Sequence, residues 1–402
     1  MSRAEPLTGQ AAEIAARSTV GPKVGLWMLA TGHAVTDSYS QSLLWPMYPL
    51  IARQLGLDLA QVAGLTTVMG LSASLAQPLL GWLSDRFPRI CMVALGPALA
   101  ALMIGFLGVA RDFATLAVIV FLAGIGIGAF HPQGAMLARQ SGRGSGLAMS
   151  AFTVGGNIGY GLAPLLSGVY LKVFGLERFY FAALPAYVFC AAMIWVFRRV
   201  DCWESVRRPK TSSVDLTGQN WPALCALTGT VVVRTTVQVG MTTFLPFLVE
   251  QRFPREMWAD VRGQAVSAFL LASAVAGPLG GMIADRFGRR RLMMWSFLLA
   301  PAPLLLGLQQ SGYGLLALLA VGAFLLMLPH PINVVMAQEF MPRSAGIAAS
   351  MITGLAAGLA VLFAWPLGAV AERTSIPDTL FWLSLLPVLG VVLVAPIPER
   401  AT

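Results

Sequence analysis

Leu75–Arg89 reads Leu-Ala-Gln-Pro-Leu-Leu-Gly-Trp-Leu-Ser-Asp-Arg-Phe-Pro-Arg, and a related stretch returns two hundred residues later at Val275–Arg289. The residues that recur at the same spacing include Gly81, Asp85, Arg86 and Phe87 in the first copy and Gly281, Asp285, Arg286 and Phe287 in the second. A period of half the chain indicates that an ancestral unit was duplicated. In a very apolar chain, such a duplication is typical of a transporter built from two membrane bundles.

The composition places most of the chain in a membrane. The 402 residues are 57% hydrophobic and only 11% charged, whereas a soluble protein of this size carries about 25% charged residues. Twelve apolar runs are each long enough to cross a hydrocarbon core, which needs about 20 helical residues. The sequence therefore predicts an all-α membrane protein with twelve transmembrane helices in two pseudo-symmetric six-helix bundles.

The apolar runs and the polar stretches between them divide the chain. The expected spans are 24–51, 60–83, 90–110, 113–138, 145–174, 178–198, 220–250, 261–284, 290–309, 313–340, 344–371 and 377–396. The expected segments are an N-terminal tail (1–22), a first bundle (23–198), a linker (199–219), a second bundle (220–397) and a C-terminal tail (398–402).

The charges in the loops predict the orientation. An even number of spans puts both termini on one side, where we count 18 Lys and Arg residues against eight on the other side. The excess of positive charge marks the cytoplasmic side, so both tails, the linker and both repeated loops are expected there. The net charge of +9 is then matched by anionic lipid headgroups, and no basic face with interleaved aromatic residues points to nucleic acid.

Nothing in the sequence indicates an enzyme. There is no nucleophile with an adjacent base, no pair of carboxylates within a span and no metal-ligand cluster. The four cysteines show no metal-ligand spacing, and we interpret them as packing residues. We expect neither a cofactor nor a metal.

Two charged residues fall near the middle of predicted spans. Asp37 stands twelve residues before Pro49, as Arg234 stands twelve before Pro246. An ionised residue at the bilayer centre costs about 2.5–3.5 kcal/mol, so the two are expected to meet across a cavity between the bundles. We assign Asp37 to proton exchange and Arg234 to an anionic group of the substrate, which its planar fork holds by two hydrogen bonds. A buried ion pair that only latches the bundles is the alternative.

Further polar residues are expected to line the path between the bundles. Helical spacing places two sets on one face each: His33, Asp37 and Gln41 in the first span, and Arg234, Gln238 and Thr242 in the seventh. We assign His33 to proton coupling with Asp37. We assign to substrate binding Arg234, His131, Gln41, Gln238, Asn157, His330 and Asn333.

Two histidines each precede a proline late in a span, as His131-Pro132 and His330-Pro331. A proline inside a helix frees the carbonyl four residues before it, so both helices are expected to kink. A titratable imidazole at a broken helix predicts a gate or a substrate contact. A histidine satisfied by a backbone carbonyl is the alternative.

The duplicated stretch resembles the cytoplasmic loop motif of the major facilitator superfamily. That resemblance implies that Gly81 and Gly281 allow close helix contact. It also implies a conformational latch made by Asp85, Arg86, Asp285, Arg286 and Arg289.

A narrower resemblance covers about residues 30–170. The patterns that carry it are Gly32-His33-x3-Asp37-x-Tyr39, Phe130-His131-Pro132-x-Gly134 and Met149-Ser150-x4-Gly155-Gly156-Asn157-x-Gly159. They look like the fosmidomycin resistance branch of the superfamily. The resemblance implies an exporter of the bacterial inner membrane that exchanges protons for a small anionic or drug-like compound. We expect it to be a monomer and to work by alternating access. An importer or facilitator of a small organic anion, and a membrane sensor that transports nothing, are the other interpretations.

Overall fold

The computed structural model describes residues 22–83, 89–141, 146–197 and 219–399. Within these ranges the chain is helical, and no strand occurs. Residues 1–21 and 400–402 of the tails, nearly all of the linker, and Asp85 and Arg86 of the first loop lie outside the described residues.

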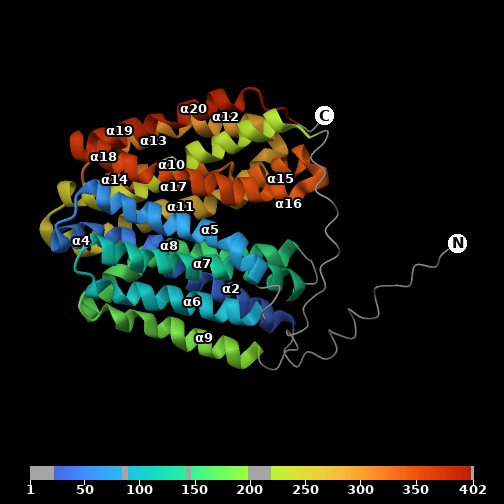
Figure 1. Ribbon diagram of the computed structural model, residues 1–402. Helices are drawn as coiled ribbons and strands as arrows, with labels where there is room; N and C mark the ends of the chain where they lie inside the picture. The colour runs from blue at the N-terminus through green and yellow to red at the C-terminus, as the bar shows by residue number, and fades with distance from the viewer. Residues whose placement is uncertain (1–21, 84–88, 142–145, 198–218, 400–402) are drawn as a thin grey trace.

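The helices form two bundles that lie side by side, one coloured blue to green and one yellow to red (Figure 1). The first bundle contains α2 (Pro22–Ser38), α3 (Gln41–Leu44), η1 (Trp45–Met47), α4 (Tyr48–Leu55), α5 (Leu59–Leu83), α6 (Arg89–Gly105), η2 (Phe106–Val109), α7 (Phe113–Ser141), α8 (Gly146–Phe174), η3 (Phe179–Ala183) and α9 (Leu184–Phe197).

The second bundle begins after the linker. It contains α10 (Trp221–Arg252), η4 (Arg255–Met257), α11 (Trp258–Phe287), α12 (Arg289–Leu299), α13 (Pro301–Leu308), α14 (Tyr313–Met327), α15 (His330–Phe340), η5 (Pro342–Ser344), α16 (Ala345–Ser350), the π-helical η6 (Met351–Leu355), α17 (Ala356–Leu362), α18 (Ala364–Arg373), α19 (Ile376–Leu385) and α20 (Pro387–Val394).

Ten helical stretches among the described residues are long and apolar enough to cross a membrane. They correspond to ten of the twelve predicted spans. The first predicted span is broken after Ser38 into α2, α3, η1 and α4. The fifth is the continuous helix α8, in which six glycines and Asn157 lower the mean hydropathy.

The two proline sites behave differently. The tenth predicted span breaks at Leu328 and Pro329, so that α15 begins at His330 with Pro331 in its first turn. This break confirms the expected interruption, because a proline fits the first turn of a helix, where its missing N–H is not needed. In the fourth span, α7 runs through Pro132 without a break.

Glycines set the distance between α2 and α8 in the first bundle. A Cβ atom added to Gly155 would lie 2.2 Å from the carbonyl oxygen of Ala30, and one added to Gly159 would lie 2.0 Å from that of Ala34. Real Cβ atoms do not approach oxygen so closely. The helices therefore touch backbone to backbone, which is the contact that small residues permit between membrane helices.

The bundles contact each other through α8 and α11 on one side and through α5 with α17 and α18 on the other. The residues that flank the linker, where the described chain stops at 197 and resumes at 219, lie toward one end of the molecule. Three polar contacts join the bundles at the other end. Arg53 Nη1 lies 2.5 Å from Glu250 Oε2, Lys172 pairs with Asp260, and the Leu59 amide donates to Glu372 over 2.9 Å. This end of the molecule is closed by charge pairs between the bundles.

Large apolar side chains are uncovered at the other end. Leu75 and Leu79 on α5, Leu147 on α8 and Met282 on α11 are all more than 60% exposed. These helices form the seam between the bundles. Charge pairs therefore join the bundles at one end of the seam, and these exposed apolar side chains lie toward the other end.

The close helix contact expected at Gly281 is wrong for this structure. A Cβ atom at Gly281 would meet nothing within 4 Å, whereas one at the preceding Gly280 would lie 1.9 Å from the Leu328 carbonyl oxygen. The residue that lets α11 approach its neighbour is thus Gly280, because its face of the helix points at the break between α14 and α15.

These contacts predict opposite effects for two glycine substitutions. Gly159→Ala forces α2 and α8 apart and is expected to destabilise the protein by about 1–3 kcal/mol, the usual cost of overpacking. Gly281→Ala has open space and is expected to leave stability unchanged or raise it by up to about 1 kcal/mol, because alanine favours helix. Thermal unfolding of the purified variants in detergent measures both effects, and an equal loss of stability in the two variants would contradict the packing described.

Candidate functional site

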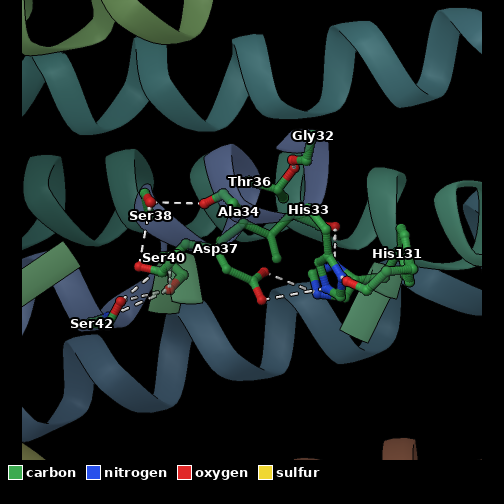
Figure 2. A network of polar contacts seen from close by, with 12 residues as sticks. Gly32, His33, Ala34, Thr36, Asp37, Ser38, Ser40, Ser42 and His131 are labelled. Atoms are coloured by element: carbon green, nitrogen blue, oxygen red, sulfur yellow. Dashed lines mark hydrogen bonds and ion pairs between the residues drawn. The ribbon is translucent and has the colours of Figure 1, made fainter. Parts of the chain in front are cut away.

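A carboxylate lies between two imidazoles in the first bundle. His33 and Asp37 stand one turn apart on α2, and His131 comes from α7, as Figure 2 shows. Asp37 Oδ2 is 3.4 Å from His33 Nε2, and Asp37 Oδ1 is 3.2 Å from His131 Nε2. We call these three residues the triad. Each carboxylate oxygen of Asp37 therefore faces one imidazole.

Backbone carbonyls hold the far side of both rings. His33 Nδ1 is 2.8 Å from the Phe152 carbonyl oxygen, and His131 Nδ1 is 2.9 Å from the Ile127 carbonyl oxygen. A carbonyl only accepts hydrogen bonds, so both Nδ1 atoms must carry a hydrogen. In a neutral ring the Nε2 atom then has a lone pair, which faces the lone pairs of Asp37. Each of the two gaps between an Nε2 atom and the Asp37 carboxylate therefore needs a proton.

The end of α2 is held next to Asp37. The Ser40 and Ser42 hydroxyls donate to the Asp37 carbonyl oxygen over 2.6 and 3.3 Å (Figure 2). The Ser40 amide also donates to this carbonyl, over 3.3 Å, in place of the i+4 amide that a continuous helix would supply. The break thus fixes the backbone of Asp37 and turns its side chain toward α7.

Packing leaves room for the triad and little more. The Phe152 ring stacks on His33 with ring centroids 4.1 Å apart and an interplanar angle of 23°. A Cβ atom at Gly156 would lie 2.5 Å from the His33 ring and 2.8 Å from Asp37 Oδ2. Phe152 and Gly156 are not among the site residues predicted from the sequence. The double glycine at 155–156 is the sequence feature that could have indicated this close contact.

The triad can be reached by solvent. The His131 side chain is 31% exposed, and the side chains of His33 and Asp37 are 11% and 15% exposed. His131 is nevertheless densely surrounded by protein atoms. The triad is thus packed among protein atoms but not sealed off, and His131 is its most accessible member.

A second polar centre lies in the second bundle around Arg234. The guanidinium is 3% exposed, and its Nη1 atom donates to the sulfur of Met327 over 2.9 Å. Sulfur is a weak acceptor, and the Nε atom of Arg234 has no hydrogen-bond partner. Among the described residues, no acidic side chain pairs with this buried cation.

Unpaired polar atoms accompany Arg234. Both side-chain polar atoms of the fully buried Asn333, on the neighbouring helix α15, lack a partner. His330 lies one turn before Asn333 on α15 and interacts electrostatically with Arg234. A buried polar group without a partner costs about 1–3 kcal/mol. Such a cluster is expected where a ligand supplies the missing bonds.

The expected ion pair between Asp37 and Arg234 is wrong for this structure. Asp37 pairs with His33 and His131 inside the first bundle, and Arg234 bonds to Met327 inside the second. The reason is that each residue faces helices of its own bundle. The cost of each buried charge is offset locally rather than across the seam.

The remaining predicted substrate residues are spread over the seam helices. Gln41 is separated from Asp37 by the break in α2 and donates to the Thr66 carbonyl oxygen over 2.8 Å, so the expected polar stripe on the first helix is interrupted. On the continuous helix α10, Gln238 is half-buried one turn after Arg234. Asn157 is exposed on α8, next to Gly156.

The predicted latch is described only in its second copy. Arg289 Nη1 lies 2.6 Å from Glu339 Oε2, which joins the start of α12 to α15 within the second bundle. Asp285 and Arg286 are exposed. Gly81 lies in α5, and Asp85 and Arg86 fall outside the described residues.

Sequence reasoning missed the charge cluster at the closed end. Glu250 accepts from Arg53 and also from Arg262, whose Nη1 lies 2.9 Å from Glu250 Oε1. Arg53 and Glu250 are separated by 197 residues, the same separation as Asp37 and Arg234. The same alignment of the two halves that predicted a pair between Asp37 and Arg234 could therefore have predicted the pair between Arg53 and Glu250.

Comparisons with known proteins agree with this fold. The sequence pattern of the Major Facilitator Superfamily matches residues 34–259. An uncharacterized MFS-type transporter, YfnC of Bacillus subtilis, is 31% identical, with 90% of this chain and 89% of that protein covered. The fosmidomycin resistance protein of Escherichia coli K12 is 28% identical, with 96% of each chain covered.

A solved structure shows the same architecture. A bacterial homolog of the human lysosomal transporter Spinster, in an inward-facing and unoccupied conformation, superposes with a TM-score of 0.70 at 15% identity, covering 94% of this chain and 97% of that one. The resemblance noted in the sequence is confirmed by these matches. The chain is a multi-pass membrane transporter that belongs to the Major Facilitator Superfamily.

Proposed function

We propose that the protein exports a small anionic organic compound in exchange for protons, by alternating access between the two bundles. The observation that carries the proposal is the triad, in which Asp37 lies 3.2–3.4 Å from two imidazole nitrogens within a membrane-spanning bundle. The substrate site of the proposal is the partly unsatisfied centre around Arg234.

The geometry of the triad supports a proton-coupling role. With both Nδ1 atoms bonded to carbonyls, each gap between Nε2 and carboxylate is stable only while a proton occupies it. The proton between Asp37 and His131 holds α2 and α7 together, and loss of the protons from the two gaps leaves lone pairs opposed. Protonation is thereby linked to the packing of two helices. Tyr160 of α8 is the other titratable group that interacts with Asp37 among the described residues.

The surroundings of Arg234 support an anionic substrate. A phosphonate, phosphate or carboxylate accepts two parallel hydrogen bonds from a guanidinium, and the Nε donor of Arg234 has no protein partner. Asn333 adds an amide that can donate to the same group. Binding would neutralise a buried cation and satisfy unpaired polar atoms at once.

The proposed location is the bacterial inner membrane, with both termini cytoplasmic. The two relatives described above come from bacteria, and the excess of Lys and Arg in the loops on the terminal side supports this orientation. In this orientation the end closed by Arg53 and Glu250 is periplasmic, and the uncovered apolar faces point to the cytoplasm. We propose a monomer in contact with anionic lipid headgroups.

Import of an organic anion is the second candidate. Protons added to the triad raise the positive charge of the seam, and positive charge attracts an anion. This electrostatic relation favours binding of protons and anion together, as in a symporter. The name of the fosmidomycin resistance protein, by contrast, favours export.

The direction of flux separates the two candidates. In proteoliposomes with a panel of labelled organic anions, including a phosphonate, an exporter accumulates substrate against its gradient only when protons move the opposite way. We expect accumulation to collapse when the pH gradient is removed. Accumulation in the same direction as the proton flow would establish import and overturn the proposed exchange.

Asp37→Asn tests the proton site. The amide keeps the size of the carboxyl group and cannot be ionised, so we expect proton-driven transport to fall to background while substrate exchange without a gradient persists. The measurement is gradient-driven uptake against counterflow in proteoliposomes. Asp112→Asn, an exposed carboxylate before α7, is the matched control and should transport normally. Gradient-driven transport at the normal rate in Asp37→Asn would remove Asp37 from the coupling.

Arg234→Gln tests the anion site. Loss of a charged hydrogen-bond donor costs about 1.5–3 kcal/mol, so the apparent substrate affinity should weaken about ten- to hundredfold. Arg111→Gln, an exposed arginine outside the spans, is the control with the same change of charge. Equal KM values for Arg234→Gln and the unaltered protein would place the substrate elsewhere.

A further inference from the structure

The three ligand atoms of the triad also meet the requirements of a metal site. One nitrogen of His33, one nitrogen of His131 and a carboxylate oxygen of Asp37 all lie within 4.8 Å of one another. Metal–ligand bonds of about 2.0–2.2 Å bring such atoms to about 3–4 Å apart. Small side-chain rotations are enough to bring the three ligand atoms from their present separations to the separations in a metal site.

We propose that His33, Asp37 and His131 bind one divalent transition-metal ion, of the class of Zn²⁺ or Co²⁺. The ligands are the two Nε2 atoms and the Asp37 carboxylate. An ion with two positive charges takes the place of the two protons that the gaps otherwise hold, so the net charge of the triad stays the same. The inference concerns binding and goes beyond the proposed transport function.

The backbone contacts of the imidazoles are those of metal-binding histidines. Such a histidine almost always donates its second ring N–H to a carbonyl or carboxylate, which fixes the tautomer and turns the lone pair toward the metal. His33 does so to Phe152 and His131 does so to Ile127, over 2.8 and 2.9 Å. Both lone pairs are thus aimed at the same carboxylate before any ion arrives.

The chemistry of the ligands selects the kind of ion. Two imidazoles and one carboxylate suit Zn²⁺, Co²⁺, Ni²⁺ or Fe²⁺, whereas Mg²⁺ and Ca²⁺ prefer oxygen ligands throughout. Access is provided by His131, whose side chain is 31% exposed. Three protein ligands leave a fourth position open to water or to an acidic group of a substrate.

The chain offers a matched control, because it contains only three histidines. Two belong to the triad, and the third, His330, lies on α15 of the other bundle. The full-length protein, purified in detergent without a histidine tag, is titrated with Co²⁺ while the visible d–d absorption of the bound ion is recorded. We expect one Co²⁺ per chain, displaced by an equimolar amount of Zn²⁺.

Removal of a ligand must weaken binding. His33→Ala and His131→Ala are each expected to raise the Kd for Co²⁺ by more than tenfold, since even the loss of a supporting contact commonly costs 10- to 100-fold. His330→Ala and Cys225→Ser, which alters an exposed cysteine, should bind as the unaltered protein does. Variants are compared only at equal thermal stability, and Asp37→Asn replaces any histidine variant that does not fold.

Two results would overturn the inference: no saturable binding at one ion per chain, or equal affinities in His131→Ala and His330→Ala. The titration uses no gradient and no substrate, so its outcome is independent of transport. A protein that exchanges protons but binds no Co²⁺ contradicts the metal site alone. One that binds Co²⁺ at the triad without proton-driven transport contradicts only the proposed function.

Discussion

A charge inside a membrane-spanning bundle has to be compensated largely by the protein itself, because the surrounding hydrocarbon cannot solvate it. The compensation in this transporter is local. Asp37 is matched by two imidazoles of its own bundle, while Arg234 has only a thioether and is left with an unused donor. One bundle thus holds a nearly complete polar cluster and the other an incomplete one. That difference between two halves of common origin is the physical basis for assigning them different tasks.

The backbone arrangement around each centre follows from breaks in helices. The first span stops after Ser38, so that serine hydroxyls bond the Asp37 carbonyl oxygen. The tenth span stops before His330, which starts a new helix beside Arg234. Unwound backbone is tolerated inside a membrane protein where it faces protein or water rather than lipid. Both breaks therefore mark the parts of the seam where polar groups gather.

The duplication also explains how the closed end is built. Arg53 and Glu250 stand at equivalent positions of the two halves, 197 residues apart, and pair with each other. Arg262 is a further partner of the carboxylate. Asp37 and Arg234 have the same separation in sequence but lie deeper in their bundles and do not pair. A conformational change that opens this end has to separate the Arg53–Glu250 contact.

The sequence by itself determined the membrane class, the duplication and the resemblance to the superfamily, because apolar span length and a repeat of half the chain are properties of composition and order. It also identified Asp37, His33, His131 and Arg234, because polar residues in apolar spans are costly enough to be conspicuous. Only the tertiary structure decided which groups these four side chains contact. The direction of a side chain on a helix depends on how far that helix is rotated and on where it breaks. Contacts at Gly155 and Gly159 set how closely α2 approaches α8, and Asp37 on α2 faces histidines of its own bundle rather than the seam.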